Sequence, residues 1–147
     1  MTTEVERMVV EAALFCLAQN IYFEARDQST AGQIAVAQVA MNRVDHEYYP
    51  NEICEVIKQG PTRINWKGNE LPIKHKCQFS WYCDGKSDVM LDKDAVMRAM
   101  ALAHVVYNNE VPDITDGATH YHAITVFPKW AFDLKKTTKI DDHIFYK

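Results

Sequence analysis

The sequence predicts an α+β fold that is mostly helical and carries a small β region late in the chain. Apolar residues recur at helical spacing in long segments, two capping boxes mark helix starts, and short extended segments gather after position 118. A chain of 147 residues has the length of one domain and can bury about 70% of its unfolded surface. We therefore expect a single domain over residues 1–147.

The first helix is predicted to begin at Thr3 and Glu6, which fit a capping box. The apolar residues that follow at spacings of three and four are Val5, Met8, Val9, Ala12, Ala13, Cys16, Leu17 and Ile21. At about 100° per residue, Glu24 falls within roughly 20° of Ala13 and Leu17. Glu24 is therefore expected to point toward the core from the C-terminal end of this helix.

A carboxylate in that position loses hydration and faces the partial negative charge of the helix end, and both effects raise its pKa. An acid that is still protonated near neutral pH can donate a proton to a leaving-group oxygen. These properties make Glu24 the candidate catalytic residue. The alternative is a structural ion pair of Glu24 with Arg26, Arg43 or another cation.

The remaining elements follow in order. A second helix starts with a capping box of Thr30 and Gln33, runs through Val44 and, being rich in small residues, is expected at the centre of the core. Residues 51–59 predict a short third helix, residues 60–71 a long loop and residues 77–82 an extended segment. Asp92 or Asp94 is expected to cap a further helix through Tyr107. Residues 118–126 and 143–146 predict two extended pieces.

Composition and charge exclude some classes of partner. The apolar and charged fractions, 48% and 24%, are ordinary for a soluble globule, and the formal charge of −4 gives no basic footprint for nucleic acid. No stretch approaches the ~20 apolar residues of a membrane span, so stable membrane insertion is not expected. Residues 8–18 lack the basic start and unbroken core of a signal peptide. Synthesis in the cytoplasm without an export signal is the expectation.

The cysteines leave several alternatives open. Cys16 lies in the apolar stripe of the first helix and is expected to be a buried thiol. Cys54, Cys77 and Cys83 could supply one bridge or three free thiols. A thiol nucleophile, Cys83 or Cys16 with His120 or His122, would indicate a cysteine peptidase or amidase, although neither cysteine has a neighbour that would lower its pKa.

The histidines could act as ligands or as groove residues. In a strand, His120 and His122 would share one face and Tyr121 would take the other. His120, His122 and His143 could together form a three-histidine zinc site of an amidase or peptidase. We favour polar lining of a groove instead and expect no metal and no cofactor.

A set of hydrogen-bonding and aromatic residues is suited to sugars, whose C–H faces stack on flat rings while their hydroxyls bind amides and alcohols. The candidate substrate-binding residues are Gln78, Ser80, Trp81, Tyr121, His122, Trp130 and His143. Phe79, between two of them, is expected in the core.

Several separated motifs resemble the SleB-type cell-wall hydrolases, which include spore-cortex-lytic enzymes and phage endolysins. They are Asn20-Ile-Tyr-Phe-Glu24-Ala-Arg26, Gly32-Gln-Ile-Ala-Val-Ala-Gln-Val-Ala-Met-Asn42-Arg43-Val44, Pro50…Cys54-Glu-Val-Ile, Gln78-Phe-Ser-Trp81, Ala118-Thr-His-Tyr-His122, Pro128-Lys-Trp130 and His143-Ile-Phe-Tyr146. The resemblance implies a lysozyme-like fold, peptidoglycan glycan strands as the substrate and Glu24 as the catalytic glutamate. It also implies groove roles for Gln78, Ser80, Tyr121 and His143.

Two departures from the family pattern affect the expected mechanism. Many members carry a second glutamate four residues after the catalytic one, where this chain has Gln28, and the glycine usual shortly before the last histidine is missing from Ile140-Asp141-Asp142-His143. Hydrolysing glycosidases use two carboxylates. A lytic transglycosylase needs one, because the C6 hydroxyl of the sugar replaces water and closes a 1,6-anhydro ring. Asp27 is expected to cap the helix or face solvent.

We therefore favour a lytic transglycosylase over a hydrolysing muramidase. The expected setting is a phage or prophage endolysin, a monomer that acts on the cell wall after its release from the cytoplasm. A non-catalytic wall-binding module is the remaining alternative.

Overall fold

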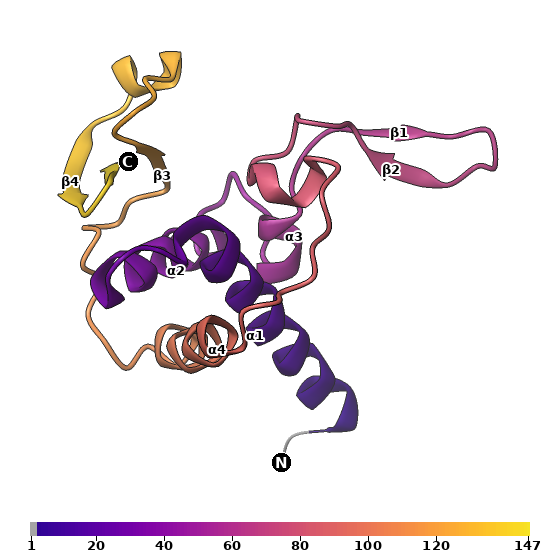
Figure 1. The fold of residues 1–147 in the computed structure, drawn as a ribbon, viewed down its shortest axis with the longest axis horizontal. Coiled ribbons are helices and arrows are strands. Elements are labelled where there is room, and N and C mark those ends of the chain that lie inside the picture. Colours follow the sequence, from indigo (N-terminus) through magenta and orange to yellow (C-terminus); the bar gives the residue numbers. More distant parts are fainter. Residues whose placement is uncertain (1–2) are drawn as a thin grey trace.

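The computed structural model describes residues 3–147, and in this part of the chain helices form the body while two small antiparallel sheets lie beside it (Figure 1). The helices are α1 (Glu4–Ala25), α2 (Thr30–Val44), α3 (Ile53–Ile57) and α4 (Lys93–Tyr107). The strands are β1 (Thr62–Ile64), β2 (Glu70–Pro72), β3 (His120–Ala123), β4 (Lys136–Ile140) and β5 (His143–Tyr146), and single 3-10 turns span Ser80–Cys83 and Lys129–Phe132. The predicted α+β class is confirmed. That the chain is a single domain stays a prediction, and its first two residues lie outside the described range.

Helix α1 begins with the predicted capping box, in which the Thr3 hydroxyl accepts from the Glu6 amide and the Glu6 carboxylate accepts from the Thr3 amide. Most of its residues from Ala13 onward are buried, whereas its first turns extend beyond the helical body (Figure 1). The prediction that Val5, Met8 and Val9 face the core is wrong, because all three are exposed on these turns.

By length and composition alone, α1 could cross a membrane, which corrects the expectation that no segment reaches that size. Half of the residues in its apolar stretch are buried inside the protein. A long core helix meets the same criterion of length and apolar composition as a membrane span, and here the buried half packs against the other helices.

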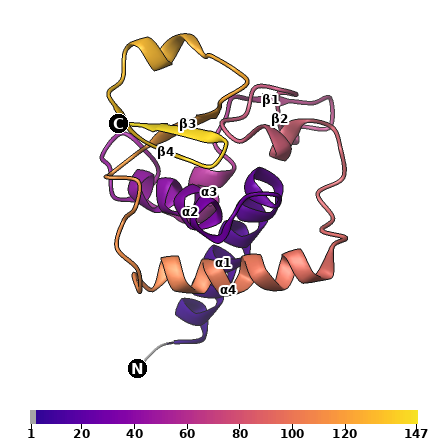
Figure 2. The same cartoon turned by 60° about the vertical axis from the view of Figure 1, so that its left-hand side comes forward.

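Helices α2 and α4 complete the helical core. The N-cap of α2 is Ser29, whose hydroxyl accepts from the Gly32 amide. The predicted capping box of Thr30 and Gln33 is therefore wrong, although the helix begins within one residue of the predicted start. Its small buried residues let α1 and α4 approach closely, as expected of a central helix. Asp92 caps α4, and the helix runs across α1 and α2 on the side away from the larger sheet (Figure 2).

The larger sheet has the strand order β3-β5-β4, with all pairs antiparallel. Strands β3 and β5 fall within the two predicted extended pieces, but β4 was not predicted. The loop predicted over residues 60–71 is in fact the β1–β2 hairpin, and the segment predicted as extended over residues 77–82 contains a 3-10 turn. Strands of three residues carry too little alternation to be recognised in a sequence.

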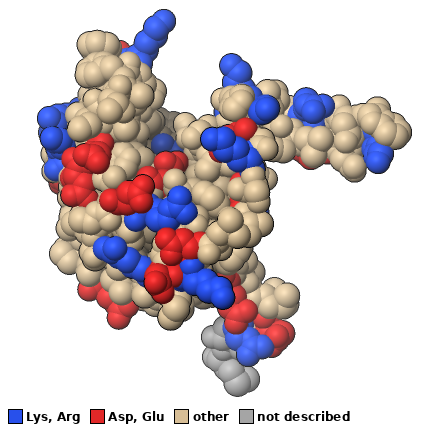
Figure 3. All heavy atoms as spheres, viewed as in Figure 1, with Lys and Arg blue, Asp and Glu red and all other residues tan. Residues whose placement is uncertain are grey.

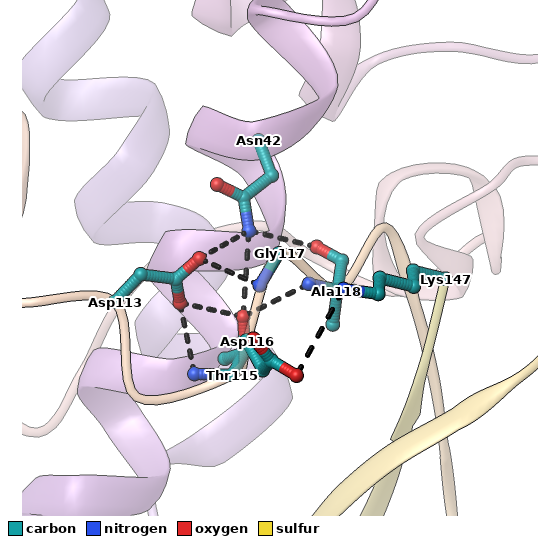
Figure 4. Close-up of polar contacts among 7 residues, drawn as sticks. All are labelled: Asn42, Asp113, Thr115, Asp116, Gly117, Ala118 and Lys147. Carbon is teal, nitrogen blue, oxygen red and sulfur yellow. Dashed lines mark hydrogen bonds and ion pairs between the residues drawn. The ribbon is translucent and has the colours of Figure 1, made fainter.

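Apolar and polar contacts attach the larger sheet and the loop before it to α2. Ala35 and Val39 pack against Ala118 and Phe145, which together form a small second core. At the end of α2, the Asn42 amide donates to the Asp113 carboxylate, the Thr115 hydroxyl and the Ala118 carbonyl, as Figure 4 shows. The Gln38 side chain of α2 also bonds to this loop, donating to the Pro112 carbonyl and accepting from the Ile114 amide. Side chains of α2 thus hold the loop immediately before β3.

Both pairs of cysteines form disulfides, Cys16 with Cys54 and Cys77 with Cys83. The prediction that Cys16 is a buried thiol is wrong, because the core face of α1 brings it to the first turn of α3. With all four cysteines paired, no thiol is left to act as a nucleophile. The cysteine peptidase or amidase alternative is therefore excluded.

Candidate active site

Glu24 opens into a cavity of about 230 Å³ between the end of α1, the segment before α4 and the larger sheet. The residues that line it are Glu24, Arg43, Gln78, Phe79, Ser80, Tyr121, His122, Ala123 and His143. Five of the seven candidate substrate-binding residues thus surround the candidate catalytic glutamate. Their roles in binding stay predictions, but the structure brings together side chains that lie up to 119 positions apart in the sequence.

The electrostatics of Glu24 follow from its burial. Loss of hydration raises the pKa of its carboxyl from 4.5 to about 7, against smaller lowering effects of the Tyr121 hydroxyl and the Arg43 charge. Among the described residues no cation lies within ion-pair distance of Glu24, and Arg26 instead donates to the Tyr22 hydroxyl. The structural ion-pair alternative is therefore not supported. At neutral pH a substantial fraction of Glu24 is protonated.

Arg43 is a site residue that sequence reasoning considered only as an ion-pair partner. It is 5% exposed, its Nε donates to the Thr119 carbonyl at 2.7 Å, and its guanidinium lies over the rings of Tyr49 and Phe79. Its second nitrogen, Nη1, is buried and has no hydrogen-bond partner among the described residues. Burial lowers the pKa of Arg43. A buried donor without a partner on a cavity wall is suited to a polar group of a substrate.

Tyr121 faces Glu24 from β3. Its hydroxyl is buried without a hydrogen bond of good geometry, and burial together with the Glu24 charge raises the pKa of Tyr121 well above its ordinary value. The ring packs edge-on against His143 and lies beside Phe145 and Phe79. Tyr121 therefore stays neutral and offers its proton toward the cavity.

The register of the sheet decides the question of a zinc site. His120 and His122 do share one face, where both rings contact Trp130, but His143 pairs opposite Ala123 and faces the other side with Tyr121. Both ring nitrogens of His122 are hydrogen-bonded, to the Tyr146 hydroxyl and the Ala123 carbonyl. The three-histidine zinc alternative is wrong, since the three rings do not converge.

The segment that carries Gln78 and Ser80 is held at both ends. The Gln78 amide donates to the Gln59 carbonyl at 2.9 Å, and the disulfide between Cys77 and Cys83 closes the loop around the 3-10 turn. The aromatic Phe79 is buried between them, as predicted. This wall of the cavity is thus fixed covalently before any substrate arrives.

Two of the predicted groove residues lie elsewhere. Trp81 is 6% exposed, stacks on Phe23 and donates from its indole nitrogen to the Asn20 side chain at 2.8 Å, so it is a core residue behind the site. Trp130 packs against His122 and Tyr146 on the face of the sheet opposite Tyr121. Neither lines the cavity, because aromatic residues near polar partners in the sequence can be buried as easily as exposed.

Gln28, which stands where many family members carry a second glutamate, lies outside the cavity. Gln28 bonds to Asp142 in the β4–β5 turn, through its amide and through the Asp142 backbone, and it does not line the cavity. Asp27 is exposed, as expected. Glu24 is the only carboxylate among the described residues that line this cavity.

Comparison with known proteins identifies the family. Residues 27–146 match the Cell Wall Hydrolase family. The chain belongs to that family. The match begins three residues after Glu24, so it does not include the candidate catalytic residue.

Individual relatives agree with this assignment. The chain is 28% identical over 130 residues to a spore cortex-lytic enzyme of Halalkalibacterium halodurans, and spans about a third of that relative, 33%, while 88% of the chain is aligned. The catalytic domain of SleB from Bacillus anthracis, described as a germination-specific lytic transglycosylase, is 25% identical with a TM-score of 0.65, over 92% of this chain and 93% of that domain.

The catalytic domain of SleB from Bacillus cereus has a similar fold at 24% identity and a TM-score of 0.63, over 93% of this chain and 91% of that domain. The predicted SleB-type membership and the lysozyme-like α+β fold are confirmed.

Proposed function

We propose that this cell-wall hydrolase family member cleaves the glycan strands of peptidoglycan as a lytic transglycosylase, with Glu24 as its acid and base. The observation that carries the proposal is a single carboxylate in the cavity, with a pKa raised to about 7. A hydrolase of the ordinary kind would need a second carboxylate on the cavity wall. The relative described as a lytic transglycosylase supports the same chemistry.

The reaction balances with one carboxyl group. Protonated Glu24 gives its proton to the glycosidic oxygen, the C1–O bond breaks, and the leaving sugar departs as an alcohol. Glu24 is now a carboxylate and takes the proton of the C6 hydroxyl as that oxygen bonds to C1. The product is a 1,6-anhydro sugar, no water is consumed, and Glu24 ends protonated as it began.

Arg43 and Tyr121 support the charged half of this cycle. Both lower the pKa of Glu24, which means that they stabilise its carboxylate form. The protonated, active form of the enzyme acquires this carboxylate as the proton is transferred, so the two residues assist the step in which the bond breaks. Burial and these two neighbours together keep Glu24 able to donate a proton and then accept one.

The experiment is mass spectrometry of the soluble fragments released from purified sacculi by wild type and by Glu24→Gln. Fragments that end in a 1,6-anhydro sugar, absent with the variant, are the expected result. Fragments one water heavier, with reducing ends, would replace the mechanism by that of a muramidase. Substantial release by Glu24→Gln would refute the catalytic role of Glu24, and free peptides would indicate an amidase or peptidase.

We further propose that the protein works outside the cytoplasm as a monomeric endolysin of phage or prophage origin. Two disulfides support an oxidising compartment, where such bonds persist. Helix α1 carries Glu24 and buries its C-terminal half, which argues against its removal as a signal segment. Lysis that requires a membrane lesion in the producing cell is the expected result, and export without a lesion would contradict this part of the proposal.

A further inference from the structure

The β1–β2 hairpin and its base, residues 58–76, form an arm that projects from the body beside the active site (Figure 1). The strands pair through Arg63 with Leu71, and the Asn65 side chain accepts from the Lys67 and Asn69 amides to organise the tip. Gly68 takes a positive φ of 81° in this turn. The tip of the arm is therefore a turn with a defined backbone conformation.

The arm exposes large apolar side chains to solvent. Trp66 is 89% exposed at the tip, beside Lys67, and Ile64 is 74% exposed. A tryptophan held in the open by an organised turn loses little conformational entropy when it binds, and such residues often supply much of the energy of an interface. Its position favours a role in contact with a partner.

The arm also differs in charge from the rest of the chain. It carries five cations and one carboxylate, whereas the whole chain has a formal charge of −4. The cations are Lys58, Arg63, Lys67, Lys74 and Lys76, and Figure 3 shows Lys and Arg side chains gathered on the arm and its base. An anionic partner is therefore favoured here, although the protein as a whole repels anions weakly.

A second cavity joins the arm to the active site. It measures about 370 Å³, is lined by Gln59, Gly60, Pro61, Lys76 and Gln78, and shares Gln78 with the cavity of Glu24. The Gln59 Oε1 atom is buried and has no hydrogen-bond partner among the described residues. A buried acceptor of this kind is suited to a hydroxyl or amide donor, and sugars with N-acetyl groups offer both.

We propose that the arm and this second cavity form an extended binding surface for a peptidoglycan strand that passes through the active site. Sugar rings would stack on Trp66, and carboxylates of the peptide stems would pair with Arg63 and Lys67. The six steps from Gly60 to Trp66, at the rise of an extended chain, span about 20 Å, so the arm would hold the polymer well beyond the cleaved bond. The inference rests on the proposed function for its substrate.

Binding can be measured apart from cleavage. In the Glu24→Gln background, co-sedimentation with purified sacculi is compared for three proteins: the parent, Trp66→Ala, and the matched control Leu91→Ala, which removes an exposed apolar residue outside the arm (82% exposed). We expect roughly tenfold weaker binding for Trp66→Ala and an unchanged affinity for Leu91→Ala. Equal binding of Trp66→Ala and the parent would overturn the inference.

The charges are tested in the same way. The double variant Arg63→Gln, Lys67→Gln is expected to weaken binding and to remove most of its salt dependence, whereas Lys136→Gln, Lys139→Gln, an equal loss of charge on exposed β4 positions, is expected to leave both unchanged. Equal effects of the two double variants would show a general charge effect and refute a specific role of the arm. Binding that disappears from sacculi stripped of phosphate polymers, or that is equalled by anionic vesicles, would also refute it.

Cleavage separates this inference from the proposed function. With active enzyme, Trp66→Ala is expected to lose activity on sacculi and to keep wild-type activity on the shortest glycan fragment that wild type cleaves. An equal loss on both substrates would show that the arm acts only through the integrity of the active site. If wild type releases no glycan fragments, the proposed function fails, and the sedimentation result still decides whether the arm binds the wall.

Discussion

Because the Glu24 carboxyl is buried, replacing it with an uncharged side chain should stabilise the folded protein at high pH. The carboxyl pKa is raised from 4.5 to about 7, so between these values the folded protein binds more protons than the unfolded chain. The contribution of Glu24 to stability must therefore fall as the pH rises through this window and level off above pH 7. The difference between the two pKa values corresponds to about 3 kcal/mol.

Glu24→Gln has no carboxyl to titrate and escapes this loss. We expect the variant to match wild type near pH 4.5 and to exceed it by about 3 kcal/mol above pH 7, a rise of roughly 6–12 °C in Tm. The assay is thermal unfolding of both proteins at intervals from pH 4.5 to 8.5. Asp27→Asn, which removes an exposed carboxylate three positions away, is the matched control for the loss of one negative charge.

A Tm difference between Glu24→Gln and wild type that does not change with pH would refute the reasoning, because it would mean that Glu24 titrates as it does in the unfolded chain. A catalytic acid with an ordinary pKa would be ionised at neutral pH, and the proposed mechanism would lose its proton donor. The same measurement thus tests the physical basis of the mechanism without any substrate.

Three other outcomes follow from single contacts. Arg43→Met removes a charge that lowers the pKa of Glu24, so the fall of kcat/KM at high pH should shift to higher pH, while Arg43→Lys should shift it less; a pH–rate profile decides this. The double variant Cys16→Ser, Cys54→Ser removes a disulfide that links residues 38 positions apart, and it should lower the free energy of unfolding by about 4 kcal/mol. A loss below about 1 kcal/mol in denaturant titration would contradict this prediction. Asn20→Ala leaves the buried Trp81 indole without its acceptor and should cost about 1–3 kcal/mol, whereas Asn20→Asp, which keeps an acceptor oxygen, tests whether that bond is the cause.

The sequence predicted those features that depend on local pattern. Periodicity and capping residues located the long helices, and the angle between Glu24 and Leu17 correctly predicted that Glu24 faces inward. Alternation in β3 correctly separated Tyr121 from the two neighbouring histidines. Each of these depends on residues within a few turns or positions of one another.

Features that depend on distant partners could not be predicted in this way. Val5 was predicted to face the core but is exposed, and Trp81 was predicted to line a groove but is buried. Both predictions failed because burial depends on which other elements pack against a residue. The pairing of Cys16 with Cys54 needs the crossing of α1 and α3, which spacing does not encode. Arg43 has the pattern of a helix residue, and it becomes a buried cation near Glu24 only because Tyr49, Phe79 and the segment that leads into β3 pack around it.

The acidity of Glu24 is itself a property of the assembled fold. Its carboxyl sits at a helix end, but the residues that exclude water from it come from α2, the disulfide-closed segment and β3. The Asn42 contacts and the small core around Phe145 hold β3 against α2, so they also hold the pKa of Glu24 near 7. A change that loosens this docking, without touching the cavity, should lower the pKa of Glu24 toward 4.5 and remove activity at neutral pH first. Activity would then persist longest at acidic pH, where Glu24 is protonated whether or not the sheet is docked.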